Sequence, residues 1–315
     1  MKHRSTVLTR RQFVTSSVAS GLWLASCSTI PSRPRASEPG QLRLVLYSDV
    51  HARVEWETPR ALAMATEAIN AQKPDLVVAN GDLITDGFQS SAATVAPRWD
   101  EYMKMHEGIE ADVYPTIGNH DLVAAIPEDN TPPAEDPRAI FRERLQVQRT
   151  FYQFDAAGYR FFVLDSIEVI GGELKYRGWI GDEQQDWLRS ELSRLPRTTP
   201  IVLALHMPLL TTFYGATKGS TFAAMPNRVV VNNREVLELF REHDLVLVLQ
   251  GHLHAKELIR WRDTTFIGGG AICGKWWRGD WYGTNPGFNV VTLRGRRVDW
   301  EYVEYGWKAR RPRHL

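Results

Sequence analysis

The sequence predicts an α/β fold, in which buried β-strands alternate with amphipathic helices. Five apolar runs have the length and composition of buried strands, and segments with helical spacing of apolar residues lie between several of them. Each run is followed by Asp, Asn or His, and chemistry concentrates at such strand ends. With 315 residues, 43% of them hydrophobic and 24% charged, the chain can bury a core as one large domain or two small ones.

The N-terminus is expected to be a targeting segment that covers residues 1–27. Residues 9–14, Thr-Arg-Arg-Gln-Phe-Val, resemble the twin-arginine export motif, and the stretch after them is too short and too polar to span a bilayer. Residues 24–27, Leu-Ala-Ser-Cys, resemble a bacterial lipoprotein processing box, in which Cys27 becomes the lipidated N-terminal residue. A plain cleaved signal with an incidental cysteine is the alternative. Residues 28–40, rich in Pro, Ser and Arg, are expected to form a flexible tether.

These features predict export in folded form by the twin-arginine route to the bacterial cell envelope. The protein would be held at the membrane by a lipid on Cys27 and would face the periplasm or the exterior. Lipidation of Cys27 would leave Cys273 without an intramolecular partner, so no disulfide framework is expected.

The charge of the chain argues against nucleic acid as an electrostatically captured partner. The net charge is +1, but residues 1–26 hold four of the 38 basic residues and no acid. The remainder therefore has 34 basic and 37 acidic residues, a formal charge of −3. Only the end of the chain, residues 306–315, is basic, and it is expected to be a solvated tail.

Residues 41–305 are expected to form the domain, and its first half alternates strands with helices. Apolar residues are continuous or alternate in the expected strands, at 42–47, 76–79 and 113–117. Helical spacing predicts helices at 59–70, with Thr58 as N-cap, and at 95–107, after Pro97. This alternation is that of an α/β protein.

The second half begins with residues 122–137, which are rich in Pro, Asp and Glu and have no apolar period. They are expected to form a loop or a lid beside the site, with disorder as the alternative. The runs 151–154 and 159–164, joined by a Gly-containing turn, predict a hairpin.

Two further helices are expected, at 182–195 with Asp182 as N-cap and at 233–243. The other apolar or alternating runs predict strands at 201–205, 245–249, 257–261, 264–267, 289–293 and 297–302. The last four of these strands are expected to form a meander.

Residues of the types that commonly bind metals follow five of the expected apolar strands. In chain order they are Asp49 and His51, Asp82, Asn119 and His120, His206, and His252 and His254. A single histidine after a strand would be assigned to structure or to the surface, but five such coincidences favour a shared site. Imidazoles, carboxylates and one amide, without thiolates, form the ligand set of a two-metal site of nitrogen and oxygen donors.

The motifs Asp-x-His, Gly-Asp, Gly-Asn-His-Asp, His and Gly-His-x-His, in this order, resemble those of the calcineurin-like metallophosphoesterase superfamily. The match runs from about residue 42 to 305. The resemblance implies a four-layer α-β-β-α sandwich, in which two packed sheets are flanked by helices. It also implies that Asp49, His51 and His254 bind one metal, that Asn119, His206 and His252 bind a second, and that Asp82 bridges them. Manganese, iron or zinc would suit these ligands.

His120 occupies the position of a family histidine that meets the phosphate without binding metal. The resemblance implies that it donates a proton to the leaving oxygen or stabilises charge on the phosphoryl group. Asp121 is then expected to orient the ring of His120 and favour its imidazolium form. The alternative is that Asp121 only caps the following turn.

Residues 268–282 are rich in Gly and Trp and resemble a stretch of some bacterial members of the superfamily. Glycines permit close approach to a ligand, tryptophans offer a stacking wall, and a guanidinium can hold a phosphate oxygen. We therefore expect Trp277 and Arg278 to contact the substrate, with packing as the alternative for the clustered tryptophans.

The sequence as a whole predicts metal-dependent hydrolysis of phosphate esters outside the cytoplasm, by a metal-bridging hydroxide. A phosphodiesterase is favoured, because a tethered enzyme with an open aromatic mouth suits a nucleotide, a phospholipid head group or an envelope polymer. The alternatives are a phosphomonoesterase, as a phosphatase or nucleotidase, and a non-catalytic metal-holding lipoprotein of the envelope.

Overall fold

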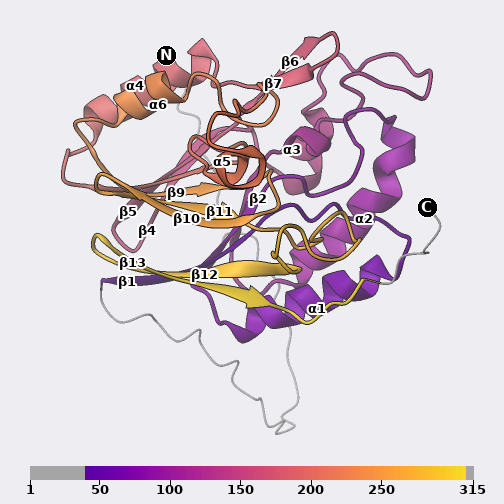
Figure 1. Cartoon of the computed structure of the whole chain (residues 1–315), viewed down its shortest axis with the longest axis horizontal. Coiled ribbons are helices and arrows are strands. Elements are labelled where there is room, and N and C mark those ends of the chain that lie inside the picture. Colours follow the sequence, from indigo (N-terminus) through magenta and orange to yellow (C-terminus); the bar gives the residue numbers. More distant parts are fainter. Residues whose placement is uncertain (1–39, 310–315) are drawn as a thin grey trace, which may run out of the picture. The chain divides into compact units, whose positions relative to one another are not determined.

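Two β-sheets form the centre of the domain in the computed structural model, which describes residues 40–309 (Figure 1). The five-stranded sheet has the order β13 (Arg297–Glu304), β12 (Gly287–Arg294), β1 (Gln41–Tyr47), β2 (Leu76–Asn80) and β3 (Val113–Thr116). The six-stranded sheet has the order β10 (Lys256–Trp261), β11 (Thr264–Gly269), β9 (Asp244–Gln250), β8 (Pro200–Leu205), β5 (Tyr159–Leu164) and β4 (Tyr152–Ala156).

The central strands of both sheets are parallel. β2 pairs in parallel with β1 and β3, and β8 pairs in parallel with β5 and β9. Parallel strands are buried on both faces, which explains why these segments are apolar runs. Alternate side chains of each strand point to opposite faces of the sheet and pack in two different clusters. In β1, Leu44 and Leu46 lie in the cluster between the sheets, whereas Val45 and Tyr47 lie in the cluster that includes the helices.

Helices cover the outer faces of the two sheets. Leu62 of α1 and Trp99 of α2 belong to the same buried cluster as Tyr47 of the five-stranded sheet, and Leu188 of α4 packs in it with Phe162 of the six-stranded sheet. Figure 1 shows the resulting order of helix, sheet, sheet and helix. The long helices are α1 (Thr58–Ala71), α2 (Ala92–Gly108) and α4 (Asp182–Arg194). The predicted α/β class and layered sandwich are confirmed.

The predicted helices are present, but their ends differ. Thr58 is not the N-cap of α1, because Glu57 holds that position and the Thr58 hydroxyl donates to the carbonyls of Arg53 and Glu55. α2 starts before the predicted residue because Ser91 accepts the N–H of Thr94, and Pro97 lies inside the helix.

The helices of the second half also differ from the prediction at their ends. Asp182 is the first residue of α4, after the N-cap Gly181, so the predicted cap is wrong there too. α6 (Asn233–Leu239) ends before residue 243. The short elements η1 (Asn119–Asp121), α3 (Ala139–Leu145), α5 (Phe213–Lys218), β6 (Ile167–Gly171) and β7 (Lys175–Gly178) were not predicted.

The four C-terminal strands are present but do not form one meander. β10 and β11 extend the six-stranded sheet, while β12 and β13 join the five-stranded sheet beside β1. Residues 270–286 therefore cross from one sheet to the other. The crossing segment hydrogen-bonds to the residues that follow β1. Ile272 N donates to Ser48 O, and Cys273 N donates to Asp49 O. The segment therefore contacts the backbone of Asp49, the first predicted ligand.

Residues 122–137 form the predicted loop, and it is tied to the residues that follow β2. Ala124 N donates to Gly87 O, and Ile126 N donates to Phe88 O, both at 3.0 Å. At the C-terminus Trp307 is buried against Trp277, with ring centroids 6.4 Å apart, so packing continues into the first part of the predicted tail.

The predicted signal, the lipidation residue Cys27 and the tether up to residue 39 lie outside the described residues. Within residues 40–309, none of the helices has the length and apolar character needed to cross a membrane.

Candidate metal centre

The side chains predicted as metal ligands meet at the carboxyl ends of five parallel strands, β1, β2, β3, β8 and β9. All of them are buried, and none is more than 7% exposed: Asp49, His51, Asp82, Asn119, His206, His252 and His254. Because the two sheets are packed against each other, residues from opposite ends of the chain reach one cluster.

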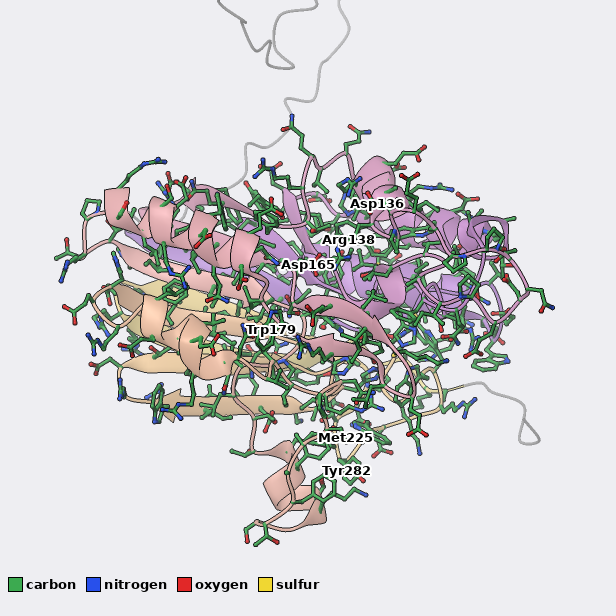
Figure 2. The ribbon with its side chains drawn as sticks, turned by 90° about the horizontal axis from the view of Figure 1, so that it is seen from above. Asp136, Arg138, Asp165, Trp179, Met225 and Tyr282 are labelled. Atoms are coloured by element: carbon green, nitrogen blue, oxygen red, sulfur yellow. The ribbon has the colours of Figure 1, made fainter. Side chains whose placement is uncertain are left out.

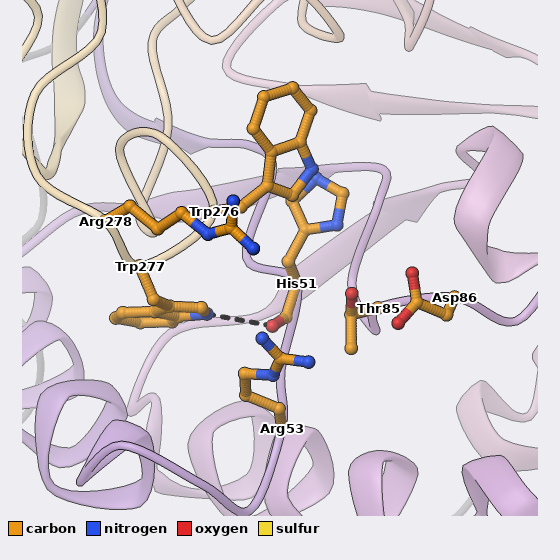
Figure 3. Close-up of a pocket in the computed structure, with 7 residues that line it drawn as sticks. All are labelled: His51, Arg53, Thr85, Asp86, Trp276, Trp277 and Arg278. Atoms are coloured by element: carbon orange, nitrogen blue, oxygen red, sulfur yellow. Dashed lines mark hydrogen bonds between the residues drawn. The ribbon is translucent and has the colours of Figure 1, made fainter. Parts of the chain in front are cut away.

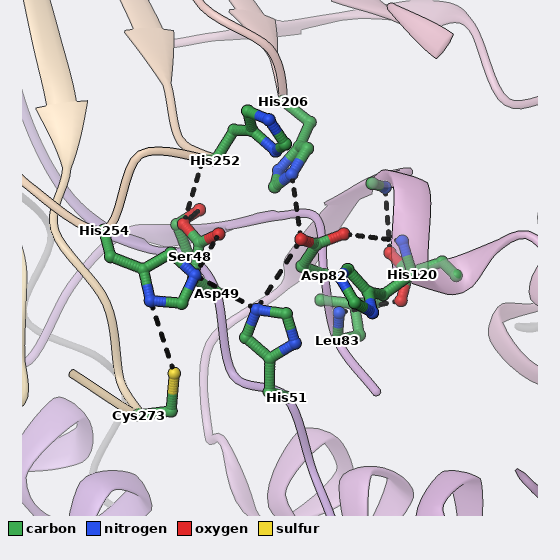
Figure 4. A network of polar contacts seen from close by, with 12 residues as sticks. Ser48, Asp49, His51, Asp82, Leu83, His120, His206, His252, His254 and Cys273 are labelled. Atoms are coloured by element: carbon green, nitrogen blue, oxygen red, sulfur yellow. Dashed lines mark hydrogen bonds and ion pairs between the residues drawn. The ribbon is translucent and has the colours of Figure 1, made fainter. Parts of the chain in front are cut away.

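Asp82 lies in the middle of the cluster (Figure 4). Its Oδ2 is 3.2 Å from His206 Nε2 and 3.6 Å from His51 Nε2. On the far side of His51, His254 Nε2 lies 3.2 Å from His51 Nε2 and 3.4 Å from Asp49 Oδ1. Asp82 belongs to two groups with metal-ligand spacing, one with His206 and His252 and the other with His51 and His120. His51 also belongs to two such groups, since it is close to His254 and Cys273 as well, so Asp82 and His51 link the two sides of the centre.

Five polar atoms of the candidate ligands are buried without a hydrogen-bond partner among the described residues. They are Asp49 Oδ1, His51 Nδ1, Asn119 Oδ1, His206 Nε2 and His252 Nδ1. A buried polar atom without a partner is costly, so native proteins rarely leave one. Several such atoms at one point fit a bound cation, which at His206 would replace a proton. Nitrogen and oxygen donors of this kind suit zinc, manganese or iron.

Main-chain carbonyls orient three of the histidines. His206 Nδ1 lies 2.8 Å from Asn80 O, His254 Nδ1 bonds to Gly274 O, and His252 Nε2 lies 3.0 Å from Asn227 O. A ring nitrogen that donates to a carbonyl must carry the proton, so the lone pair of the other nitrogen faces inward. His206 and His254 therefore present Nε2 to the centre, and His252 presents Nδ1.

The backbone around the ligands adopts strained conformations. Five of the seven ligands have positive φ angles: Asp49 (52°), His51 (45°), Asp82 (53°), His252 (71°) and His254 (56°). Left-handed conformations of non-glycine residues cluster at functional sites, where the surroundings must hold them. Here Asp49 N donates to Gly81 O and His51 N donates to Asp82 O, which locks the loops after β1 and β2 together.

Gly118 is required because another chain segment approaches it closely. Its φ is −106°, which any residue can adopt, but a Cβ at this position would lie 2.3 Å from Asp82 Oδ1. Gly118 therefore lets the loop after β3 approach the central carboxylate.

Charge in the cluster is shared between Asp82 and His206. Burial opposes a positive charge on His206, but the adjacent Asp82 carboxylate outweighs it and raises the pKa of His206 to about 9. Burial likewise opposes ionisation of Asp82, yet the surrounding imidazoles, above all His206, hold the pKa of Asp82 well below its usual range. Burial raises the pKa of Asp49 and lowers the pKa of His51 and of His252.

His120 lies beside the cluster with its ring partly exposed. Its ring centroid is 4.7 Å from that of His51, and its backbone N–H donates to Asp82 Oδ1 at 2.8 Å. The backbone N–H of Asp86 donates to His120 Nδ1 at 3.1 Å. Because Nδ1 accepts this bond, the proton of the neutral ring is on Nε2, which is free to donate to a ligand.

Asp121 does not orient His120, so that prediction is wrong. Its carboxylate accepts the backbone N–H of Leu83 at 2.7 Å, of Ile84 at 3.2 Å and of Gly118 at 2.8 Å. It thereby joins the loop after β2 to the loop after β3. Since one of these bonds caps the turn at Gly118, the role of Asp121 is similar to the alternative expectation that it only caps a turn. Burial raises the pKa of Asp121 to about 8, and the nearby charge of Asp82 acts in the same direction.

A pocket of about 250 Å³ opens beside His51 (Figure 3). It is lined by His51, Arg53, Thr85, Asp86, Trp276, Trp277 and Arg278. Arg278 is exposed at its edge, and its contact with substrate stays a prediction.

Trp277 is only 2% exposed, and its indole N–H donates to the carbonyl of His51 at 2.9 Å, so it supports a ligand. The ring that covers the centre is that of Trp276, 4.5 Å from His254. Trp277 also lines the pocket, so its contact with substrate stays a prediction, whereas Trp276 was not predicted. The sequence prediction also missed Arg53, although its position two residues after His51 was a usable signal.

Cys273 lies behind His254 and does not face the centre. Its Sγ is 3.7 Å from the outward Nδ1 of His254 and donates to Gly274 O at 3.3 Å. Burial raises the pKa of this thiol well above its usual range, although its Sγ lies within metal-ligand spacing of His51 and His254.

Comparisons with known proteins agree with this geometry. A model of the calcineurin-like phosphoesterase family matches residues 42–256. A probable cyclic nucleotide phosphodiesterase of Synechococcus sp. is 27% identical over 248 residues, which cover 74% of this chain and 81% of that one. Purple acid phosphatase 13 of Arabidopsis thaliana is 31% identical over 133 residues, or 40% of this chain and 23% of that one.

The fold is also similar to that of a dimetal phosphatase from Danio rerio, with a TM-score of 0.58 at 15% identity over 85% of this chain and 100% of that one. The family match spans more than half of the chain and includes every strand that carries a candidate ligand. The chain belongs to the calcineurin-like phosphoesterase family.

Proposed function

We propose that this phosphoesterase is a phosphodiesterase with two metal ions. The observation that carries the proposal is the buried cluster of unpartnered donor atoms around Asp82, open on one side to a pocket. One ion would be held by Asp49, His51 and His254 and the other by Asn119, His206 and His252, with Asp82 between them. Bound metals of this kind supply positive charge for the phosphoryl oxygens and an activated water.

The charges of the ligand set favour an anionic substrate. Two carboxylates, Asp49 and Asp82, contribute −2 against +4 from two divalent ions, so the loaded centre stays positive and attracts a phosphate. His120 adds a hydrogen-bond donor for the phosphate. The backbone N–H of Asp86 occupies its Nδ1, so the ring proton is on Nε2 and can be donated to a phosphoryl or leaving oxygen.

The pocket beside His51 favours a diester over a monoester. A monoester carries one organic group, whereas a diester carries two and needs room on both sides of the phosphorus. The space lined by Trp276 and Arg278 can take the second group. The similarity to a probable cyclic nucleotide phosphodiesterase supports this choice, since it spans most of both chains.

A phosphomonoesterase is the second candidate. It is favoured by the similarity to a purple acid phosphatase, although that match covers 40% of this chain. A non-catalytic metal-holding protein would have no use for a histidine whose Nε2–H is available to a phosphate. The hydrogen bond from Asp86 to His120 Nδ1 therefore argues against that alternative.

The experiment that decides is a comparison of bis(4-nitrophenyl) phosphate with 4-nitrophenyl phosphate, with metal content measured after loading with manganese, zinc or iron. We expect two metals per chain and a kcat/KM at least about tenfold higher for the diester, a difference of about 1.4 kcal/mol in the barrier. The reverse preference would indicate a phosphomonoesterase. No hydrolysis with two metals bound would indicate a binding protein.

We also propose that the protein acts in the cell envelope, anchored through Cys27. The support is in the sequence, which has the twin-arginine motif at 9–14 and the lipoprotein box at 24–27. Fractionation of cells that express the full chain should find the protein in the membrane. Cys27→Ala should move it to a soluble fraction, and a membrane-bound variant would contradict the lipid anchor.

A further inference from the structure

A continuous path of aromatic rings leads from the metal centre to the surface. The centroid distances along this aromatic path are 4.5 Å from His254 to Trp276, 5.9 Å to Trp281, 4.7 Å to Tyr282, 5.1 Å to Phe213, 5.2 Å to Tyr214 and 5.7 Å to Phe222. Beyond His254, the rings come from two segments far apart in sequence, 213–222 and 276–282. Such contacts lie within the range of favourable aromatic pairs.

The middle of the path packs against the ligand loop. Leu253, between the candidate ligands His252 and His254, packs in a buried cluster with Phe213 and Ala255, against which Trp281 also packs. A ligand that contacts Trp276 at the start of the path lies beside His254 and the metal centre.

The outer end of the path is exposed, although its side chains are large and apolar. Tyr282 is 54% exposed, Phe222 is 44% exposed, and nearby Met225 is 49% exposed. Figure 2 shows Met225 and Tyr282 at the same edge of the domain. Grouped exposed apolar side chains mark binding surfaces, because water contact with them is unfavourable.

The chemistry of these side chains restricts what can cover them. Phe222 and Met225, at the exposed end, contact a ligand only through apolar surface. A flexible alkyl chain needs only apolar contact. The ammonium of Lys275, 5.1 Å from the ring of Trp281, adds a cation that suits an anionic head group.

We propose that the aromatic path binds the apolar alcohol portion of a lipid-type phosphodiester, whose phosphate occupies the metal centre. This inference rests on the proposed phosphodiesterase function. It narrows the substrate class to phosphodiesters in which one ester group is an alkyl or acyl-bearing alcohol.

Alkyl 4-nitrophenyl phosphates with methyl, butyl and octyl groups, kept below their aggregation concentrations, test the proposal. Each fully buried methylene can raise kcat/KM by up to about fourfold, so partial burial should give the octyl ester at least a roughly tenfold advantage over the methyl ester, through a lower KM. Equal values along the series would overturn the inference while leaving a phosphodiesterase intact. Failure to hydrolyse any of the esters would instead overturn the proposed function.

Binding of methyl- and octylphosphonate to the metal-loaded protein, measured by calorimetry, tests the path without turnover. A tighter octyl complex supports it, and equal affinities would count against it. Phe222→Ser combined with Tyr282→Ser should reduce the octyl-to-methyl ratio towards one, and Met225→Ser alone should reduce it in part. The matched control is Trp261→Ser, since Trp261 is 44% exposed at the end of β10 and outside the path. A loss of the ratio in this control would contradict the assignment.

Discussion

The indole N–H of Trp277 donates to the carbonyl oxygen of His51 at 2.9 Å, and both residues are buried. His51 has a φ of 45°, so its side chain points to the centre only while this strained backbone is held. A tryptophan from the segment between β11 and β12 thus supports a ligand from the loop after β1.

Trp277→Phe should weaken metal binding by roughly tenfold, since it keeps most of the packing but removes the hydrogen bond to a ligand residue. Competition with a chelator measures this affinity. Trp307→Phe is the matched control, because the indole N–H of Trp307 is buried without a partner among the described residues. Equal affinities of the two variants would show that the bond to His51 is unimportant.

His120→Ala should lower kcat by about 10² to 10⁴ while both metals stay bound, because it removes a donor to the phosphate and no metal ligand. Turnover of the diester and metal analysis check the two parts. The backbone bond from His120 to Asp82 survives this substitution. His106→Ala, on α2 away from the centre, should leave both quantities unchanged. Metal loss in His120→Ala would identify His120 as a ligand.

At pH 9, where Asp121 is ionised, Asp121→Asn should destabilise the protein by about 1 to 3 kcal/mol, because the new amide NH₂ must face a backbone N–H that the carboxylate accepts. Thermal unfolding measures the loss. Asp129→Asn is the control, since Asp129 also accepts backbone N–H groups but is solvent-exposed, and water can replace its bonds. If the melting temperature of Asp121→Asn were unchanged and its pH profile of turnover were shifted, Asp121 would have the predicted role of orienting His120.

Metal affinity should rise with pH because a metal must displace the proton of His206. The pKa of His206 is raised to about 9, so at neutral pH this ligand is protonated in the metal-free protein. Affinity should increase up to about tenfold per pH unit below pH 9, with about one proton released per metal bound at this site. Calorimetry in two buffers of different ionisation enthalpy counts the protons. Absence of proton release at pH 7 would contradict the shifted pKa.

The shifts of His206 and Asp121 predict that the metal-free protein loses stability as the pH rises from about 7 to 9. Protonated His206 stabilises the fold fully below its ordinary pKa of 6.5, and this contribution is lost as the pH rises through about 9. Asp121, with its pKa raised to about 8, prefers the protonated form when folded and therefore acts in the same direction between its ordinary 3.8 and 8. The melting temperature of the metal-free protein should be lower at pH 9 than at pH 7, and metal should reverse the trend.

Much of the site could be predicted from the sequence because the ligand types follow apolar runs. Asp49, Asp82 and His206 come at the ends of parallel strands, and such ends lie at one edge of a sheet whatever the loops do. The residue types also defined the donor chemistry. Gly118 stands in the Gly-Asn-His-Asp motif, but its close approach to Asp82 is visible only in the structure.

The tertiary structure alone decided where side chains in the loops point. Trp276 and Trp277 have φ angles of 45° and 64°, so neither follows the alternation of a strand, and sequence spacing does not say which ring faces the centre. The partners of Asp121 are backbone N–H groups from another loop, which carry no sequence signal. The sequence determined which atoms are available for metal and phosphate. The packing of the two sheets and the crossing segment between them decided which of those atoms meet, because those contacts join residues more than 200 positions apart.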